Sequence, residues 1–457
     1  MAKTGIYVGL DIGTTSVKVV VAEYIEGQIN IIGVGNAKSE GLSRGIVTDI
    51  DNAAASITRA ISQAEEKSGI KIRNVNVGLP ANLLQVESCE GMIAVNTEAK
   101  EITDEDVRKV SAAAIVRSTP PERQIVAIVP KEFKVDGFEG IKDPRGMIGV
   151  RLDMSGVVYT GPKTIVHNIR KCVEKAGLQI AELVITPLAL TESILSDGEK
   201  DFGTIVIDMG GGQTTTAVIY DHDLKFAHVE QEGGEFISKD ISVVLNTSLN
   251  NAEALKINYG DAYPERTSEQ EEFPVDVIGK SEAVKVDERY LSEIIEARME
   301  QIFSKSKDML EQIEALNLPG GIVLTGGNAG IPGVVELATD IFDRQVRLYV
   351  PNHMGLRNPI FSNAISIVEY GSRLSEIHRL ANSAIMGERR PVMATPDVRP
   401  VIQKSQPAQQ SQQIQQTAPV QEYSEYTQTD EEFLGNTETK GDNVKEKLKG
   451  FLSNIFD

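Results

Sequence analysis

The chain has 457 residues, with 46 Lys or Arg against 66 Asp or Glu, and its formal net charge is −20 at pH 7. A chain this acidic is poorly suited to nucleic acid, because binding to the phosphate backbone depends on basic side chains. Its two cysteines, Cys89 and Cys172, belong to no CxxC pair and no cluster of His ligands, which indicates buried, reduced thiols rather than a disulfide framework or a structural zinc site.

Residues 1–388 have the pattern of an α/β protein. Apolar runs such as IYVGL, TIVID and GIVLT predict strands, and amphipathic stretches between them predict helices. The first residues lead straight into a predicted strand rather than a signal peptide, and no apolar run approaches the ~20 residues that a membrane span requires. We therefore expect a cytoplasmic body of two domains, each of roughly 150–200 residues.

Two segments of this body resemble each other. Residues 8–23, VGLDIGTTSVKVVVAE, predict a strand that ends at an aspartate, a turn rich in Gly and hydroxyl side chains, and a returning strand; residues 205–221, IVIDMGGGQTTTAVIYD, repeat the pattern. Each is a hairpin, unlike the strand-to-helix turn of a Walker loop or a dinucleotide fold. The repeat predicts two related lobes that face each other.

The composition of the two hairpins suits a phosphate. Glycines let backbone N–H groups approach closely, hydroxyls add donors, and a lysine adds a point charge. Asp11 and Asp208 are then expected to face a phosphate-bound Mg²⁺, which needs few protein ligands because it keeps several waters. One hairpin alone would be explained as an ordinary turn, but two copies favour the phosphate interpretation. The candidate phosphate-binding residues are Gly13, Thr14, Thr15, Ser16, Lys18, Gly210, Gly211, Gly212, Gln213 and Thr214, with Thr215 as a further hydroxyl.

A third glycine-rich element follows at residues 321–342, GIVLTGGNAGIPGVVELATDIF. Gly326 and Gly327 come directly after a predicted strand, and residues 331–337 predict the start of a helix with Pro332 near its beginning. Such a turn can close over a base or a ribose. It is equally compatible with a plain strand-to-helix connection.

The end of the chain has a different character. From about Arg390 to Lys440 it is rich in Gln, Ser, Thr and Pro, a composition that predicts a disordered linker. Residues 441–457 then predict an amphipathic helix that binds an anionic membrane surface, with lysines beside the apolar face. Docking on a partner or back on the chain's own domain is the alternative. The candidate membrane-binding residues are Val444, Lys447, Leu448, Lys449, Phe451, Leu452, Ile455 and Phe456.

The order of hairpin, hairpin and TGG turn resembles the superfamily of actin, sugar kinases and DnaK-type chaperones. Within it, the chain most resembles the FtsA family of bacterial cell-division actins. That closer resemblance rests on several passages together, which are GLDIGTTSVKVVVAE, IDMGGGQTT, GGEFISKDI, AEALKINYG, EIIEARMEQI, LTGGNAGIPGV and the tethered terminal helix.

The resemblance implies an α/β, actin-like fold of two lobes, in which an inserted subdomain of lobe one replaces the usual second subdomain. Part of the insertion is expected as a helix from Thr103 to Arg117. The implied parts are 1–83 and 162–200 for the lobe one core, 84–161 for the inserted subdomain, 201–226 and 312–388 for the lobe two core, 227–311 for the outer subdomain of lobe two, 389–440 for the linker and 441–457 for the membrane-targeting helix.

The resemblance also implies an adenosine site formed by Glu253, Lys256, Gly326, Gly327 and Asn328. Without it, Glu253 and Lys256 would be interpreted as a weak surface pair on a helix.

Hydrolysis in this superfamily uses a carboxylate or amide that orients water. At the matching position this chain has Thr186, a poor base. We therefore expect at most weak ATPase activity, unless Glu192 substitutes, and the catalytic residue is left unassigned.

The function implied is that of an ATP- and Mg²⁺-binding adaptor that polymerises with itself at the septum, on the cytoplasmic face of the membrane. Its implied partners are anionic lipids, other division proteins and the C-terminal tail of the tubulin-like FtsZ. The tail is expected to dock within residues 227–311, where a helix carries Arg289, Arg298, Lys305 and Lys307. A pilus-assembly actin relative is the nearest alternative. A small-molecule kinase or a peptide-binding chaperone would explain only the cleft and none of the other features.

Overall fold

The computed structural model describes residues 5–96, 99–116 and 120–386. The predicted linker, 389–440, and the predicted membrane-targeting helix, 441–457, lie outside the described residues. Within these ranges, no helix combines the length and the apolar composition needed to cross a bilayer. Cys89 and Cys172 are both buried, as predicted.

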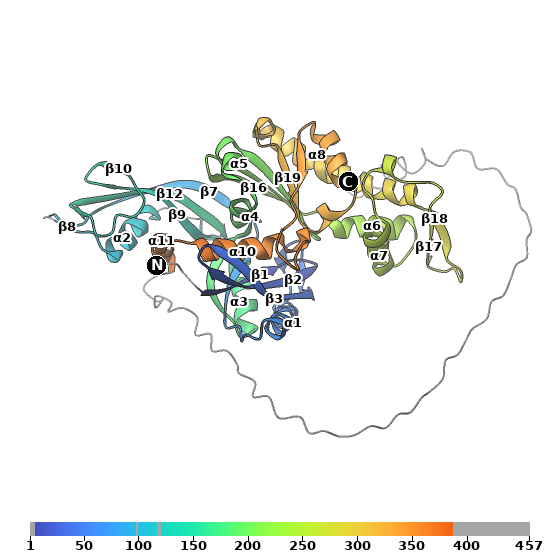
Figure 1. The fold of residues 1–457 in the computed structure, drawn as a ribbon, viewed down its shortest axis with the longest axis horizontal. Coiled ribbons are helices and arrows are strands. Elements are labelled where there is room, and N and C mark those ends of the chain that lie inside the picture. The colour runs from blue at the N-terminus through green and yellow to red at the C-terminus, as the bar shows by residue number, and fades with distance from the viewer. Residues whose placement is uncertain (1–4, 97–98, 117–119, 387–457) are drawn as a thin grey trace, which may run out of the picture. The chain divides into compact units, whose positions relative to one another are not determined.

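Two five-stranded sheets of matching topology form the cores of the two lobes (Figure 1). In each sheet a three-stranded antiparallel meander is extended by two parallel strands on the side of its first strand. The predicted repeat and the actin-like fold are thereby confirmed. The strands of lobe one are β1 (Gly5–Ile12), β2 (Ser16–Ile25), β3 (Gln28–Lys38), β6 (Asn74–Leu79) and β13 (Gln179–Ile185). Those of lobe two are β14 (Thr204–Met209), β15 (Thr214–Tyr220), β16 (Asp223–Glu230), β19 (Ile322–Thr325) and β20 (Val346–Leu348).

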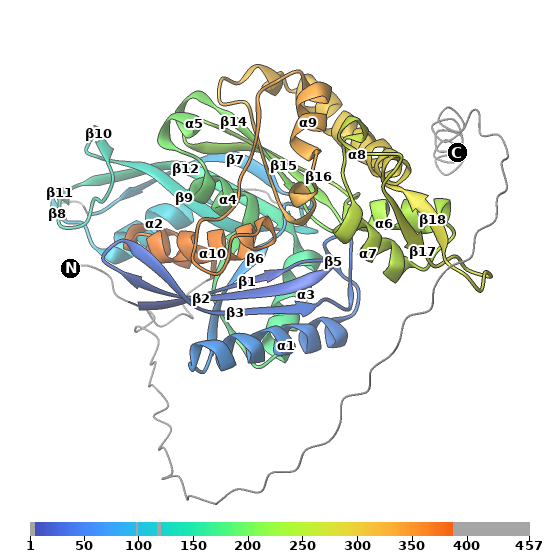
Figure 2. The same ribbon diagram turned by 45° about the vertical axis from the view of Figure 1, so that its right-hand side comes forward.

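Both faces of the lobe one sheet are covered by helices, so β2, which lies between β1 and β3, is apolar on both sides. Val17, Val19 and Val21 face a core shared with α1 (Ile50–Ser68) and α3 (Lys163–Lys175). Val20 and Ala22, which alternate with them, pack against α10 (Ser362–Arg373). Figures 1 and 2 show α10 in orange against the blue strands β1 and β2. A small hairpin of β4 (Leu42–Ser43) and β5 (Ile46–Val47) separates β3 from α1.

The inserted subdomain contains a four-stranded antiparallel sheet in the order β10-β9-β12-β7. This sheet spans residues 85–162, which differs by one residue at each end from the expected insertion of 84–161. The helix expected over 103–117 is observed as α2 (Asp104–Ala114), and Asp106 closes a capping box with Thr103 at its start. The strands are β7 (Gln85–Ala94), β8 (Lys100–Glu101), β9 (Arg123–Val135), β10 (Phe138–Ile141), β11 (Ile148–Gly149) and β12 (Arg151–Pro162).

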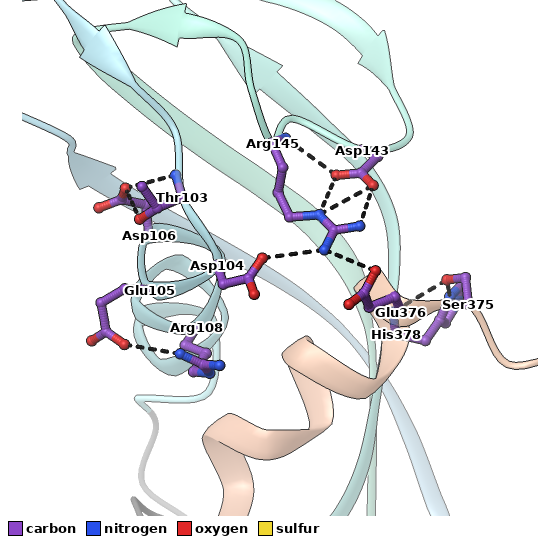
Figure 3. A network of polar contacts seen from close by, with 10 residues as sticks. All are labelled: Thr103, Asp104, Glu105, Asp106, Arg108, Asp143, Arg145, Ser375, Glu376 and His378. Atoms are coloured by element: carbon purple, nitrogen blue, oxygen red, sulfur yellow. Dashed lines mark hydrogen bonds and ion pairs between the residues drawn. The ribbon is translucent and has the colours of Figure 1, made fainter. Parts of the chain in front are cut away.

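A helix from far along the chain completes the core of the inserted subdomain. Ile377, Leu380 and Ala381 of α11 (Glu376–Met386) are buried in one cluster with side chains of α2, β9 and β12. Arg145 Nη1 lies 3.1 Å from Glu376 Oε2 and 3.1 Å from Asp104 Oδ1, so it ties α11 to α2 (Figure 3).

The expected lobe two core of 312–388 is therefore too long at its C-terminal end. Its last two helices pack elsewhere: α10 lies on the lobe one sheet, and α11 lies on the inserted subdomain.

The remaining elements belong to lobe two or lie between the lobes. Apolar residues of α4 (Thr186–Ile194) share a core with the lobe two strands and the inserted sheet. Phe303 of α8 (Glu288–Gln312) and Phe342 of α9 (Val334–Phe342) meet edge-on, with 5.5 Å between their ring centroids. The other elements of lobe two are α5 (Asp197–Phe202), α6 (Gly234–Val244), α7 (Leu249–Tyr259), β17 (Glu272–Val275), β18 (Val284–Asp287), α8 (Glu288–Gln312) and α9 (Val334–Phe342).

Candidate functional site: the cleft between the lobes

A cavity of about 640 Å³ lies between the two lobes. Both predicted hairpins line it, together with the start of α4, one face of α7, the TGG turn and the loop at residues 357–360. Cavities of this size accommodate a small organic ligand.

The two hairpins have the same turn. Gly13 N donates to Ser16 O at 3.2 Å in the first hairpin, and Gly210 N donates to Gln213 O at 3.0 Å in the second. Each turn begins two residues after its aspartate. The sequence repeat therefore corresponds to a structural repeat, which brings two equivalent strand ends to one cavity.

The hairpin tips interlock. A Cβ built on Gly211 would overlap the side chain of Thr15, and one on Gly212 would overlap that of Thr14. Thr14 Oγ1 also accepts a hydrogen bond from Gly45 N at 2.9 Å, which draws the β4–β5 hairpin over the tips. The glycines are thus required for a close approach between lobes as well as for exposing backbone N–H groups.

The two aspartates lie in different electrostatic surroundings. Asp11 Oδ2 is 3.3 Å from Lys18 Nζ on the neighbouring strand. Burial raises the pKa of Asp208, and the charge of Asp11 raises it further, although a hydrogen bond from Asn363 and the charge of Lys18 lower it. A bound cation would relieve the unfavourable burial of the Asp208 charge.

The cavity also contains acceptors with unused capacity. Gln213 Oε1 and Asn363 Oδ1 are buried and have no hydrogen-bond partner among the described residues. Two carboxylates and two such amide oxygens are hard oxygen donors, the kind that a hydrated Mg²⁺ prefers. The residues present therefore fit a phosphate-bound magnesium.

Most of the predicted phosphate-binding residues line the cavity, and two do not. Thr214 Oγ1 is buried and donates to Glu232 O at 2.9 Å, while Thr215, on the opposite face of β15, lines the cavity. Alternation along a strand explains this difference between neighbours. Ser16 is also absent from the lining; its Oγ is buried without a partner in the described part of the chain.

The predicted adenosine-binding pair on α7 lines the cavity too. Lys256 is buried, and its Nζ lies 2.8 Å from Glu253 Oε2 and 2.9 Å from Gly234 O. Glu253 also accepts a hydrogen bond from Ser238. The pair is therefore part of a partly buried network that joins α6 to α7, in which Lys256 is buried and Glu253 is half exposed, unlike an isolated pair on a solvated helix face.

The TGG turn supports the second hairpin directly. Asn328 Nδ2 donates to Gly210 O at 2.8 Å, so this side chain holds the hairpin in place. Gly326 has φ of 92°, and a Cβ there would overlap Asp208 Oδ1. Gly326, Gly327 and Asn328 all line the cavity, and the helix after them, α9, begins at Val334, later than predicted.

Of the two candidates for orienting water, only Thr186 borders the cavity. Glu192 lies on the same helix but pairs with Lys200, with Oε2 and Nζ 3.0 Å apart, and is not among the lining residues. Glu192 therefore does not lie where it could orient water in the cavity in place of Thr186.

The four cations on which the predicted tail-binding helix face depends lie on α8, and most of them have partners within lobe two. Arg298 is buried, and its Nε lies 2.6 Å from Asp240 Oδ2. Lys305 Nζ lies 2.7 Å from Glu232 Oε1, and Lys307 Nζ donates to Ile341 O at 2.9 Å. Arg289 is half-buried, with carboxylates of Glu269 and Glu293 3.7 Å away. Arg298 and Lys305 thus neutralise acidic side chains of their own lobe, and Lys307 binds a backbone carbonyl there.

The sequence analysis missed several of the lining residues, and two of them are polar contributors of the turns described above or of their surroundings. Asn363 and Gly45 line the cavity, from α10 and from the β4–β5 hairpin. Neither residue belongs to the repeated hairpin pattern or to the TGG turn. A prediction of long-range packing would have been needed to find them.

Comparisons with known proteins agree with this geometry. A family model described as "Cell division protein FtsA" matches residues 205–366, one described as "SHS2 domain inserted in FTSA" matches 82–160, and one described as "Cell division protein FtsA, C-terminal" matches 377–457.

Among solved structures, the PilM–PilN type IV pilus biogenesis complex resembles the chain with a TM-score of 0.55 and 16% identity, covering 80% of this chain and 99% of the other. At that identity the likeness concerns the fold alone. Among sequences, the cell division protein FtsA of Bacillus subtilis is 43% identical, covering 82% of this chain and 86% of the relative. The corresponding protein of Enterococcus faecalis is 71% identical over 100% of both chains. The chain therefore belongs to the FtsA family of cell division proteins.

Proposed function

We propose that this cell division protein binds Mg-ATP in the cleft between its lobes. The observation that carries the proposal is the convergence of two equivalent hairpins, each with a buried or partly buried aspartate, on one cavity. The hairpin N–H groups and hydroxyls hold the phosphates, Lys18 adds positive charge, and Asp11 and Asp208 hold magnesium largely through its waters. Glu253, Lys256 and the TGG turn lie where they can enclose the nucleoside.

In this proposal the main role of the bound nucleotide is to control polymerisation, and ATP hydrolysis is slow. Thr186 occupies the place of a water-orienting carboxylate and cannot act as an effective base. Slow hydrolysis would leave the closed, interlocked arrangement of the hairpins long-lived, which suits a protein that polymerises with itself.

The proposal also includes binding to the membrane and to FtsZ. Residues 441–457 bind anionic lipid on the cytoplasmic face at the septum, and the outer subdomain of lobe two binds the FtsZ tail. Support comes from the amphipathic pattern at the C-terminus and from membership of the family. Because the cations of α8 are largely engaged within lobe two, the tail-binding surface must use other groups besides them.

Calorimetry with Mg-ATP tests the nucleotide site. We expect wild-type protein to bind, and Asp208→Ala to lose at least tenfold in Mg-dependent affinity, because a metal-facing carboxylate is removed. Asp308→Ala removes an exposed carboxylate of α8 that is not among the lining residues, and serves as the control. Equal affinity in all three proteins would reject the proposal.

A further inference from the structure

The side chain of Asn363 is hydrogen-bonded to that of Asp208. Asn363 Nδ2 donates to Asp208 Oδ2 at 2.9 Å. An ionised carboxylate can only accept, so the amide nitrogen must face it. This orientation turns Asn363 Oδ1 away from Asp208 and leaves it as a buried acceptor without a partner among the described residues.

The backbone that carries Asn363 is firmly held. Asn363 is the second residue of α10, and the residues after it, Ala364, Ile365 and Val368, are buried against the lobe one sheet. The helix approaches β1 so closely that a Cβ on Gly9 would overlap Ala364 O and Val368. On the other side, Ser362 Oγ and Thr325 Oγ1 are hydrogen-bonded at 2.8 Å. Asn363 is thus presented from a helix of lobe one to a carboxylate of lobe two.

We propose that Asn363 is a positioning residue, which orients Asp208 toward the phosphate-bound magnesium and accepts a hydrogen bond from a metal-bound water through Oδ1. The inference rests on the proposed function. Its physical basis is that groups behind a metal-facing carboxylate restrict its rotation and thereby raise metal affinity. Both ends of the Asn363 amide then have a partner, which accounts for the acceptor that is otherwise left buried without one.

A purely structural role makes a different prediction. If the Asn363–Asp208 bond only tied the lobes together, its loss would weaken nucleotide binding by the same factor with and without magnesium. A positioning role affects the magnesium-dependent part alone. The informative quantity is therefore the magnesium advantage, the ratio of the Kd for ATP in EDTA to the Kd in Mg²⁺.

The test compares Asn363→Ala and Asn363→Leu with wild type in the full chain, by calorimetry in Mg²⁺ and in EDTA. The leucine variant keeps most of the side-chain volume but donates no hydrogen bond. We expect both to lower the magnesium advantage about tenfold while the Kd in EDTA stays within twofold of wild type. Ser362→Ala is the matched control, since it removes the neighbouring bond between lobes without touching the carboxylate, and its magnesium advantage should equal that of wild type.

The inference is overturned if both Asn363 variants keep the magnesium advantage of wild type. It is also overturned if they lose affinity for ATP by the same factor in EDTA as in Mg²⁺. Loss of the folded state in both variants, followed by circular dichroism, would also assign Asn363 a structural role. If wild type itself shows no magnesium advantage, the proposed nucleotide site fails, and the inference fails with it. The wild-type measurement thus distinguishes failure of the proposed nucleotide site from failure of the positioning role of Asn363.

Discussion

The guanidinium carbon of Arg44 lies 5.7 Å from the centroid of the Phe236 ring, and this contact joins the β4–β5 hairpin of lobe one to α6 of lobe two. Arg298, on α8, approaches the same ring at 5.6 Å. Arg44 has φ of 49°, an uncommon conformation for a residue with a side chain. Gly45, the next residue, donates to Thr14 at the tip of the first hairpin. The short hairpin therefore crosses the cleft beside the proposed phosphate site.

Removing the Arg44 contact should speed the release of nucleotide. A cation–π contact at an exposed site contributes about 0.5–1 kcal/mol, so we expect Arg44→Ala to release a fluorescent ATP analogue roughly two- to fivefold faster in stopped-flow displacement. Arg59→Ala is the control, because Arg59 is also exposed but pairs with Glu40 within lobe one. If both variants release nucleotide at the wild-type rate, the contact does not hold the cleft closed.

Arg298 should be far more important for stability than Arg289. Arg298→Ala leaves Asp240 buried without its partner, and breaking a buried pair in this way costs about 3–5 kcal/mol. Arg289→Ala removes a half-buried group whose carboxylate partners are 3.7 Å away, and should change the free energy of unfolding by at most about 0.5 kcal/mol. Urea unfolding of both variants measures the difference. Similar small losses in the two would show that α8 tolerates either change.

Glu369 should make stability depend on acid pH. Burial alone would raise its pKa, but hydrogen bonds from His353 and Ser193 and the charge of Arg373 outweigh burial, so the pKa lies below its usual 4.5. A carboxyl with a lowered pKa stabilises the folded state above its unfolded-state pKa, and this contribution is lost as the pH falls below 4.5 toward the lowered value.

We therefore expect Glu369→Gln to lower the free energy of unfolding by about 1.5–3 kcal/mol at neutral pH, and the gap from wild type to shrink below pH 4.5. Urea titrations of the two proteins at both pH values measure this gap. A gap that is constant with pH would contradict the assignment.

Thr186→Glu should increase ATP hydrolysis. The new carboxylate would enter the cavity at the start of α4, where it can orient the attacking water. Phosphate release assays should show slow wild-type turnover and a faster variant, whereas Glu192→Gln, outside the lining, should match wild type. Wild-type turnover near ~10 s⁻¹ would show that Thr186 does not limit hydrolysis.

Two aspartate substitutions test the membrane-binding segment. Phe451→Asp places a charge in the apolar stripe of the predicted helix, and Ser453→Asp adds the same charge on the opposite face. A buried CH₂ contributes about 0.8 kcal/mol, so loss of one Phe should strongly reduce recovery in liposome flotation, while Ser453→Asp should have little effect. Equal recovery of Phe451→Asp and wild type would refute membrane binding through this face.

Short-range patterns in the sequence determined the elements of the cleft. The Asp, Gly and Thr pattern of the hairpins is specified over about ten residues, because turn geometry and strand alternation are local properties. Its repetition at residues 8–23 and 205–221 predicted two related lobes that face each other, and the structure has two matching sheets with a shared cavity. The pattern predicted Thr214 as a phosphate-binding residue, but its hydroxyl is buried against Glu232 O. A local pattern does not specify which of two adjacent hydroxyls faces the cavity.

Long-range packing decided the rest. Asn363 meets Asp208 across 155 positions in the sequence, and buried Arg298 pairs with Asp240 and Glu232, which lie about 60 positions before it. Likewise, α11 belongs to the inserted subdomain because that subdomain has an apolar face that α2 and its own sheet leave uncovered. A local sequence shows whether a helix has a charged or an apolar face. Which partner covers that face depends on how the whole chain folds, because burial and pairing are properties of contacts between distant segments.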